Sequence, residues 1–210
     1  MTWIEWLDKL DKVAFILIHN DSDHYIFDNF FLVIRNALTW IPVYITILIF
    51  AMQKFRKSAL LFIIFSVVTF ALCDRLSSGL LKPLFERPRP CYDPMIQPFL
   101  RNLIECGGRY SFPSSHAANH FGLASFWYWT ILYNIGKKWK WLWLWASIVG
   151  YAQIYVGKHY PLDIAGGALL GIVLGTSMAW IFENWQSLKA AVINTFKPAI
   201  IENIKKLNSQ

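Results

Sequence analysis

The sequence predicts an all-α fold: an integral membrane helical bundle with five or six transmembrane helices and an amphipathic N-terminal helix. Hydrophobic residues make up 56% of the chain. Charged residues make up 16%, well below the roughly 25% that is typical of a soluble domain. Long apolar segments recur along the chain with short basic stretches between them, which is the pattern of a multi-pass membrane protein.

Five apolar segments are predicted to cross the membrane. They cover residues 36–53, 58–81, 112–134, 141–156 and 161–182. A helix needs about 20 apolar residues to cross the hydrocarbon core, so we expect the short first and fourth segments to extend into their flanks. In the last segment, Gly167, Gly171 and Gly175 recur every four residues. Small residues at this spacing let two helices approach closely.

The N-terminal region, residues 1–35, has a different character. Residues 2–20 combine acidic and basic side chains with apolar side chains at helical spacing. They form either a sixth span or a helix that lies in the membrane interface. Residues 27–34 are a candidate for a second interfacial piece. The first twelve residues mix acids and bases, so we expect no cleavable signal peptide.

The positions of the basic residues predict the orientation in the membrane. An alternating path places the following residues on one side: Lys54, Arg56, Lys57, Lys137, Lys138, Lys140, Lys189, Lys197, Lys205 and Lys206. Basic loops are typical of the cytoplasmic side. We therefore expect a multi-pass protein of the cytoplasmic (inner) membrane, with a membrane-embedded domain at residues 1–183. Residues 184–210 would form a basic amphipathic cytoplasmic tail. This explains the net charge of +7 without nucleic acid.

Three polar clusters lie at the opposite ends of the predicted spans, at residues 82–90, 113–116 and 159–163. The same alternating path puts all three on the periplasmic or extracellular side. Ionisable residues at a membrane boundary are costly unless they meet in a polar site. The clusters contain cations, hydroxyl groups, two histidines and a carboxylate, which together can hold a phosphate and break its ester bond.

Each cluster supplies one part of such a site. Lys82 and Arg89 offer positive charge and donors that match phosphate oxygens. Ser114 is placed to cap a helix, whose first amides bind anions. Asp163 follows His159 by one helical turn, where it can orient one ring nitrogen and leave the other to attack phosphorus. Structural interpretations also exist: Lys82 as an interface anchor, Ser114 as a simple cap and Asp163 as a partner of the helix dipole.

Two further pairs of residues have alternative interpretations. His116 and His120 are four residues apart, a spacing that metal sites also use. No acidic or cysteine ligands accompany them, so we expect no metal and no cofactor. Cys91 and Cys106 flank one long polar loop, residues 82–111. They are either paired, if the loop faces an oxidising compartment, or two free thiols.

The motifs resemble the signature of the type-2 phosphatidic acid phosphatase superfamily, in its branch of membrane lipid phosphatases. That signature is Lys, six residues, Arg-Pro; then Pro-Ser-Gly-His; then Ser-Arg, five residues, His, three residues, Asp. The matching residues are Lys82, Arg89 and Pro90, then Pro113, Ser114 and His116 with Ser115 in place of glycine, and then His159 and Asp163. The resemblance covers about residues 58–182.

The resemblance implies a metal-independent phosphatase that hydrolyses a lipid phosphomonoester or diphosphate at the outer face of the cytoplasmic membrane. It implies that His159 forms a phosphohistidine, that Asp163 orients His159, and that His116 protonates the leaving group and later activates water. The residues that would bind phosphate are Lys82, Arg89, Ser114 and, through nearby amides, Ser115. The expected partners are the lipid phosphate and membrane lipids, with no nucleic acid and no obligate protein partner.

The third motif departs from the family pattern at Gln153, which occupies the position of the usual phosphate-binding arginine. Its amide would still donate hydrogen bonds to phosphate, but without charge. Either Lys158, Arg87 or Arg109 replaces that charge, or the protein is a slow or inactive enzyme that binds or transports a lipid phosphate. The sequence leaves the lipid open among phosphatidylglycerophosphate, undecaprenyl diphosphate, phosphatidic acid and lipid A.

Overall fold

The computed structural model describes residues 2–20 and 25–207 of the chain, with side chains described up to residue 187. Within this part the secondary structure is helical, apart from an isolated bridge between Pro88 and Tyr110. The principal helices are α1 (Trp3–Asn20), α2 (Tyr25–Ile34), α3 (Ile41–Phe55), α4 (Ala59–Asp74), α5 (Lys82–Phe85), α6 (Ser115–Ile135), α7 (Trp141–Tyr155) and α8 (Pro161–Leu207). The all-α prediction is confirmed.

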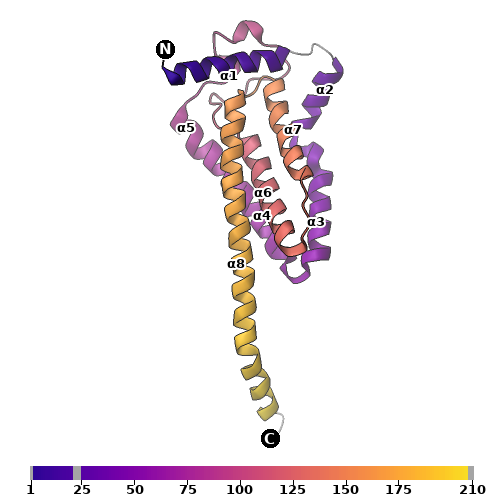
Figure 1. Cartoon of the computed structure of the whole chain (residues 1–210). Coiled ribbons are helices and arrows are strands. Elements are labelled where there is room, and N and C mark those ends of the chain that lie inside the picture. The colour runs from indigo at the N-terminus through magenta and orange to yellow at the C-terminus, as the bar shows by residue number, and fades with distance from the viewer. Residues whose placement is uncertain (1, 21–24, 208–210) are drawn as a thin grey trace.

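Five of the described helices, α3, α4, α6, α7 and α8, run along one long axis and form the membrane bundle (Figure 1). They correspond to the five predicted spans. α4 continues through a π-helical stretch (Arg75–Leu81) into α5, so this span reaches Phe85. Two stretches, Ala37–Phe85 and Pro161–Ser187, are long and apolar enough to cross a membrane, and the first of them contains both α3 and α4.

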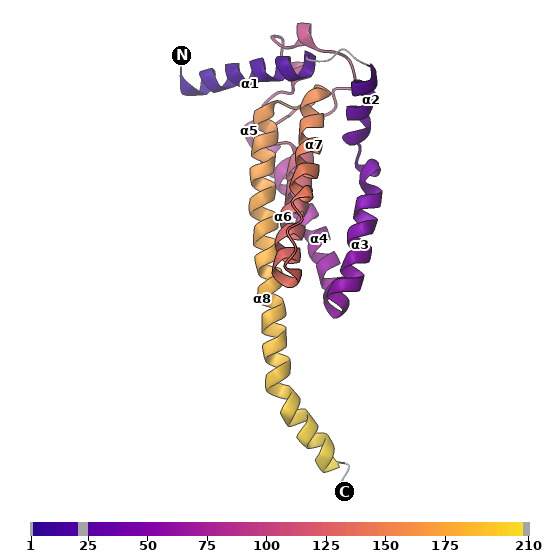
Figure 2. The same cartoon turned by 45° about the vertical axis from the view of Figure 1, so that its right-hand side comes forward.

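α8 is longer than its predicted span. The helix continues to Leu207 and extends beyond the rest of the bundle (Figure 2). The expected tail, residues 184–210, therefore begins as a continuation of α8. The basic side chains expected there lie outside the described side chains: Lys189, Lys197, Lys205 and Lys206. Residues 208–210 lie outside the described residues.

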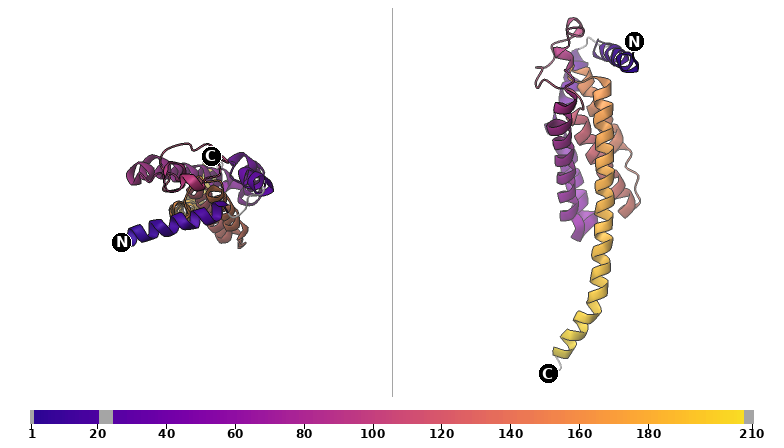
Figure 3. Two further views of the ribbon diagram at one scale, coloured as in Figure 1. Left: turned by 90° about the horizontal axis from the view of Figure 1, so that it is seen from above. Right: turned by 90° about the vertical axis from the view of Figure 1, so that its left-hand side faces the viewer.

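α1 lies crosswise over the ends of α7 and α8 (Figures 1 and 3). Its buried side chains, Asp11, Phe15 and His19, follow one another every four residues and therefore share one face. Apolar side chains on the rest of its surface, such as Trp3 and Leu17, are exposed. The crosswise position and the exposed apolar surface favour a helix lying in the interface over a sixth span.

α2 packs on α7, with the ring centroid of Phe31 4.2 Å from that of Tyr155 and 5.3 Å from that of Tyr151. A 3₁₀ turn (Ala37–Trp40) joins α2 to α3, and the two helices follow one another along the same side of the bundle (Figure 2). Of the two expectations for residues 1–35, an interfacial piece or part of the first span, this arrangement favours the second for residues 27–34.

α6 packs closely on α8 because of the predicted glycines. A β-carbon at Gly171 would lie 2.7 Å from the backbone nitrogen of Gly122, and one at Gly175 would lie 2.8 Å from Cβ of Ser125. Neither distance leaves room for a side chain, as expected for helices that meet through small residues. This contact brings together the first turns of α6 and α8, and each of these turns carries one of the polar motifs.

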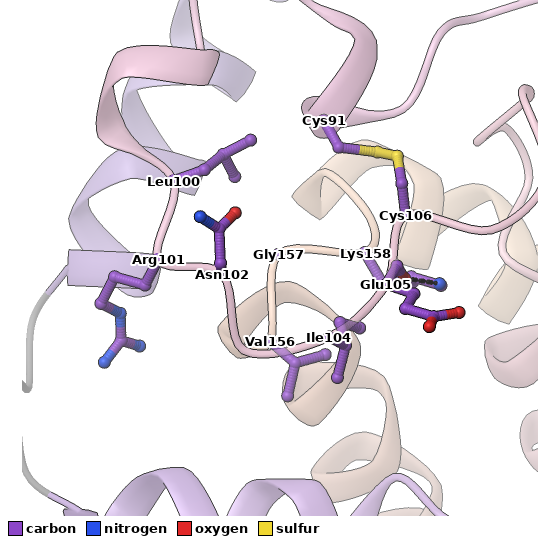
Figure 4. Close-up of a pocket in the computed structure, with 10 residues that line it drawn as sticks. All are labelled: Cys91, Leu100, Arg101, Asn102, Ile104, Glu105, Cys106, Val156, Gly157 and Lys158. Carbon is purple, nitrogen blue, oxygen red and sulfur yellow. Dashed lines mark hydrogen bonds between the residues drawn. A yellow bond between two sulfur atoms is a disulfide. The ribbon is translucent and has the colours of Figure 1, made fainter.

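The polar loop between α5 and α6 folds over the same end of the bundle as α1 (Figure 1). A disulfide joins Cys91 to Cys106 within it (Figure 4), so the paired state is the one present. Beneath the loop, Phe15 of α1 and Ile96 of the loop are buried together with Tyr160 at the start of α8. The loop, α1 and the start of α8 thus form one cap on the bundle.

We expect Gly171→Ala to destabilise the protein, because its new methyl group would overlap the backbone of α6 at Gly122. Overpacking of this kind typically costs about 1–3 kcal/mol. The matched control is Gly79→Ala, since nothing lies within 4 Å of a β-carbon at Gly79. The measurement is thermal unfolding of the purified protein in detergent. Equal unfolding temperatures for the two variants would contradict the close contact of α6 and α8.

Candidate active site

The three polar motifs meet at one end of the bundle. Lys82 begins α5, Ser114 caps α6, and His159 lies in the turn before α8. The backbone amide of Ser114 donates to the carbonyl of Asp163 at 2.9 Å, which joins the second motif to the third. Arg89 Nη1 lies 3.4 Å from Nε2 of His159, which joins the first motif to the third. The chain therefore brings residues from three distant segments into one site.

His159 and Asp163 form the centre of this site. Nδ1 of His159 is 3.5 Å from Oδ2 of Asp163, an ion-pair distance that is long for a hydrogen bond. The backbone amide of Tyr160 donates to the same carboxylate oxygen at 2.8 Å. Burial, opposed in part by Asp163, lowers the pKa of His159 to about 4, so its imidazole is neutral near pH 7. With its proton on Nδ1, facing Asp163, the ring has a lone pair on Nε2 that can act as a nucleophile.

Arg87 contacts the other carboxylate oxygen of Asp163. Its Nη1 donates to Oδ1 of Asp163 at 2.8 Å, and its Nη2 donates to Asp8 at 3.0 Å and to Asp11 at 2.7 Å. Asp11 also accepts from the backbone amide of Leu162 at 2.8 Å, which ties α1 to the first turn of α8. Arg87 is thus committed to three carboxylates. The expectation that it replaces the charge missing from the third motif is corrected.

The buried and half-buried basic side chains at this end of the bundle fall into two groups. Carboxylates neutralise the first group: Lys12 pairs with Asp8 and Asp93, Arg87 with Asp8, Asp11 and Asp163, and Arg101 with Asp28. The second group forms no ion pair with any described carboxylate: Arg35, Lys82, Arg89 and Lys158. Each member of this group interacts electrostatically with other members or with the two motif histidines. Positive charge left uncompensated at one place attracts an anion.

Arg89 and Lys158 use their donors on main-chain oxygens. Arg89 donates through Nε to the carbonyl of Gly108 and through Nη1 to that of Lys158 at 3.2 Å. Nζ of Lys158 donates to the carbonyl of Glu105 at 2.5 Å (Figure 4). Burial, together with the neighbouring Arg89, lowers the pKa of Lys158 to about 8. Carbonyl groups orient these cations without neutralising them, so Arg89 and Lys158 can attract phosphate.

The serines and the second histidine occupy the first turn of α6. Oγ of Ser114 accepts from the amide of Ala117 at 3.4 Å, which is the predicted cap. Oγ of Ser115 is buried and has no hydrogen-bond partner among the described residues. His116 is half-buried and interacts electrostatically with His159. In the part of the chain that the structure describes, no three His, Cys, Asp or Glu residues are grouped so as to hold a metal ion.

Gln153 and Arg109 approach the site through their backbones. The carbonyl of Gln153 accepts from the amides of Lys158 at 3.0 Å and His159 at 3.2 Å, so it shapes the turn that carries the nucleophile. The carbonyl of Arg109 accepts from the amide of Arg89 at 3.2 Å. The side chain of Arg109 is exposed. That Arg109 supplies the missing charge stays a prediction. Among the three alternatives, Lys158 is the one that lies beside Arg89 without an ion pair to a described carboxylate.

Two residues that the structure places at or beside the site belong to none of the three sequence motifs. Asp11 supports Asp163 through Arg87, and Arg35 belongs to the group of uncompensated cations. The available signal was the occurrence of charged residues in otherwise apolar surroundings. Asp11 lies on the buried face of an amphipathic helix, and Arg35 stands alone between two apolar segments.

Two hollows adjoin the site. A pocket of about 360 Å³ lies between the disulfide-bonded loop and the turn at Gly157 and Lys158 (Figure 4). A wider groove of about 550 Å³ runs between α1 and the starts of α6 and α8. Its lining is mostly apolar and includes Phe85, Phe112 and Leu162, with Arg87 at its border. Hydrocarbon can therefore lie next to the charged centre.

Comparison with known proteins identifies relatives of the chain. A model of the PAP2 superfamily matches residues 57–187. A lipid A 4'-phosphatase of Porphyromonas gingivalis is 32% identical over 82% of this chain and 72% of the relative. A lipid A 4'-phosphatase of Bacteroides thetaiotaomicron is 32% identical over 85% of this chain and 78% of the relative. The crystal structure of a transmembrane PAP2-type phosphatidylglycerolphosphate phosphatase from Bacillus subtilis has the same fold, with a TM-score of 0.64, 21% identity and 88% of each chain covered.

We expect Arg87→Gln to destabilise the protein strongly, because Asp11 and Asp163 would remain buried without a cation. Removing one partner of a buried ion pair typically costs about 3–5 kcal/mol. Lys9→Gln is the control, since Lys9 is exposed on the same end of the molecule and forms no ion pair with the described residues. Unfolding in detergent, followed by circular dichroism, measures both. A similar stability for the two variants would show that Arg87 does not hold α1 to α8.

Proposed function

The chain belongs to the PAP2 superfamily and is a membrane lipid phosphatase, and from this premise we propose a substrate, a mechanism and a side of the membrane. The substrate is a lipid phosphomonoester of the lipid A class. The reaction passes through a phosphohistidine on His159 and uses no metal. It takes place on the outer face of the cytoplasmic membrane.

The observation that carries the mechanism is the buried His159, which lies beside Asp163 on one side and Arg89 on the other. In the first step Nε2 of His159 bonds to phosphorus while the bond from phosphorus to the lipid oxygen breaks. The leaving oxygen takes a proton from His116. Asp163 stabilises the positive charge that develops on the imidazole. Lys82 and Arg89 stabilise the charge on the phosphoryl oxygens.

The second step returns the enzyme to its starting state. Water attacks phosphorus, His116 accepts a proton from that water, and the bond from phosphorus to Nε2 breaks. Inorganic phosphate leaves, and the imidazole of His159 is neutral again. Each histidine thus has a distinct task, and the same pair serves both steps because the roles of acid and base reverse. Nothing in this sequence of steps requires a metal ion.

The relatives support lipid A as the class of substrate. Both lipid A 4'-phosphatases match more than four-fifths of this chain at 32% identity. The apolar groove between α1 and the starts of α6 and α8 adds support from the chain itself, because an acyl chain in it would lie beside the phosphate. A diphosphate such as undecaprenyl diphosphate is the competing substrate, and direct comparison of the two lipids separates them.

The side of the membrane follows from charge and topology. The basic turn between α3 and α4 lies at the opposite end of the bundle from the three motifs (Figure 1). Basic loops favour the cytoplasmic side, so the motifs are assigned to the outer face. The disulfide in the loop above them is consistent with an oxidising compartment.

His159→Ala should abolish catalysis. We expect phosphate release from lipid A to fall by at least about 10³-fold, as when other nucleophiles are removed. With a substrate labelled in the scissile phosphate, wild type denatured under alkaline conditions should carry a phosphoryl group that is stable in base and lost in acid, and His159→Ala should carry none. Full activity in His159→Ala would exclude the mechanism. Saturable binding of lipid A by the wild type without any phosphate release would instead favour a binding or transport protein.

The acid limit of activity should lie well below the ordinary titration range of histidine. His159 must be neutral to attack, and its pKa of about 4 means that it stays neutral until the pH falls to that region. Because His116 must carry a proton to act as the acid while His159 is neutral, kcat/KM should not fall between pH 7 and 5. It should decline only as the pH approaches 4, where His159 of the free enzyme gains a proton. An acid limb centred near 6.5, the ordinary histidine value, would contradict the buried neutral imidazole.

A further inference from the structure

The backbone of Gln153 holds the turn that carries His159, and its uncharged side chain is buried without a partner among the described residues. Gln153 is completely buried, and neither its side-chain oxygen nor its nitrogen has a hydrogen-bond partner among the described residues. Buried polar atoms without partners are costly and rare, so a ligand is the natural partner for them. A phosphate dianion at this position needs a cation from another part of the chain.

Arg35 directly follows the last residue of α2 and interacts electrostatically with Arg89, His116 and Lys158. Its amide donates to the carbonyl of Phe31 at 3.0 Å, so the two residues follow the helical spacing and share one face of α2. That face packs on α7, where the ring centroid of Phe31 is 4.2 Å from that of Tyr155. Further along the chain, the ring of Trp40 packs on Trp145 at 5.9 Å. Arg35 comes between these two contacts along the chain, so its backbone lies where α2 and the following turn pack beside α7.

The guanidinium of Arg35 has no counter-charge. It forms no ion pair within the described residues, and its Nε is buried without a hydrogen-bond partner there. The groups with which it interacts electrostatically are Arg89, His116 and Lys158, all of them at the candidate site. A partly buried cation whose neighbours are also basic destabilises the free protein. Binding of an anion removes that repulsion.

We propose that Arg35 is a phosphate-binding residue, which supplies from the junction of α2 and α3 the guanidinium that Gln153 lacks. The proposal rests on the proposed function and adds a residue to the same site. A guanidinium offers paired donors that match two oxygens of a phosphate. Arg35 lies outside residues 57–187, the part of the chain that the PAP2 superfamily model matches, so none of the family motifs assigns it a role.

The first test replaces Arg35 by glutamine in the full-length protein. We expect kcat/KM for phosphate release to fall about 10²-fold, the loss typical for one donor to a developing anion. The matched control is Arg75→Gln, because Arg75 is exposed and forms no ion pair with the described residues. The unfolding temperature of Arg35→Gln should stay the same or rise, since the change removes an unpaired charge. A fall in unfolding temperature with activity retained would assign Arg35 a structural role and overturn the proposal.

The second test restores a positive charge to the site by placing an arginine at position 153 of α7. In the double variant Arg35→Gln/Gln153→Arg, kcat/KM should recover about tenfold or more relative to Arg35→Gln, because a charged donor again reaches the phosphate. Gln153→Arg alone should give no comparable gain, since the site already has its cation. A large gain in Gln153→Arg alone, with no loss in Arg35→Gln, would show that the site lacks a charge that Arg35 does not provide.

A third measurement separates this proposal from the proposed function. Orthovanadate binding, measured by isothermal titration calorimetry, requires no turnover. Arg35→Gln should weaken vanadate binding about tenfold or more, and Arg75→Gln should leave it unchanged. Unchanged affinity in Arg35→Gln would overturn the proposal. If vanadate binding depends on Arg35 but the wild type hydrolyses no lipid phosphate, Arg35 remains a phosphate-binding residue and the proposed function fails.

Discussion

The buried carboxylate of Asp163 connects the segments that form the site. It accepts from Arg87 and from the backbone amide of Tyr160, and it lies beside His159. Its own carbonyl accepts from Ser114 at the start of α6. A buried carboxylate is stable only when it is paired and hydrogen-bonded, so this set of contacts requires a fixed position for α5, α6 and α8 relative to one another. The small residues between α6 and α8 permit that position.

The same constraint explains why α1 lies across the bundle. Nη1 of Arg87 donates a hydrogen bond to Asp163, and Nη2 donates to Asp11 and Asp8 of α1. Asp11 in turn holds the amide of Leu162 at the start of α8. The N-terminal helix is therefore part of the support for the nucleophile, although it contributes no atom to the proposed chemistry. Its exposed apolar surface keeps it at the membrane boundary, next to the groove that leads toward the site.

The two groups of cations have different roles: the first stabilises the fold, and the second is available to bind phosphate. Arg87, Lys12 and Arg101 are neutralised and hold segments together. Lys82, Arg89, Lys158 and Arg35 form no ion pair with a described carboxylate and lie close to one another or to the two motif histidines. An anion is needed to complete the second group, whereas the first is complete in the folded protein.

Much of the site could be predicted because its residues follow local rules. The spacing of His159 and Asp163 is one helical turn, and the alternation of spans places all three motifs at one end. The glycines of α8 predicted a close helix contact, and Gly171 makes one. Asp11 and Arg35 could not be predicted in the same way, because each acts across a long sequence separation and belongs to no motif. For residues 2–20 the sequence allowed either a sixth span or a helix in the membrane interface, because amphipathic spacing alone does not determine the orientation of a helix relative to the membrane.

The central claim is that a phosphate binds at Nε2 of His159 between these uncompensated cations. The most direct measurement is an experimental structure of the protein with orthovanadate, which resembles phosphorus in the act of transfer. We predict vanadium bonded to Nε2 of His159, with Lys82, Arg89 and Arg35 donating to its oxygens. Vanadate held elsewhere, such as in the pocket beside Glu105 and away from both motif histidines, would contradict this account.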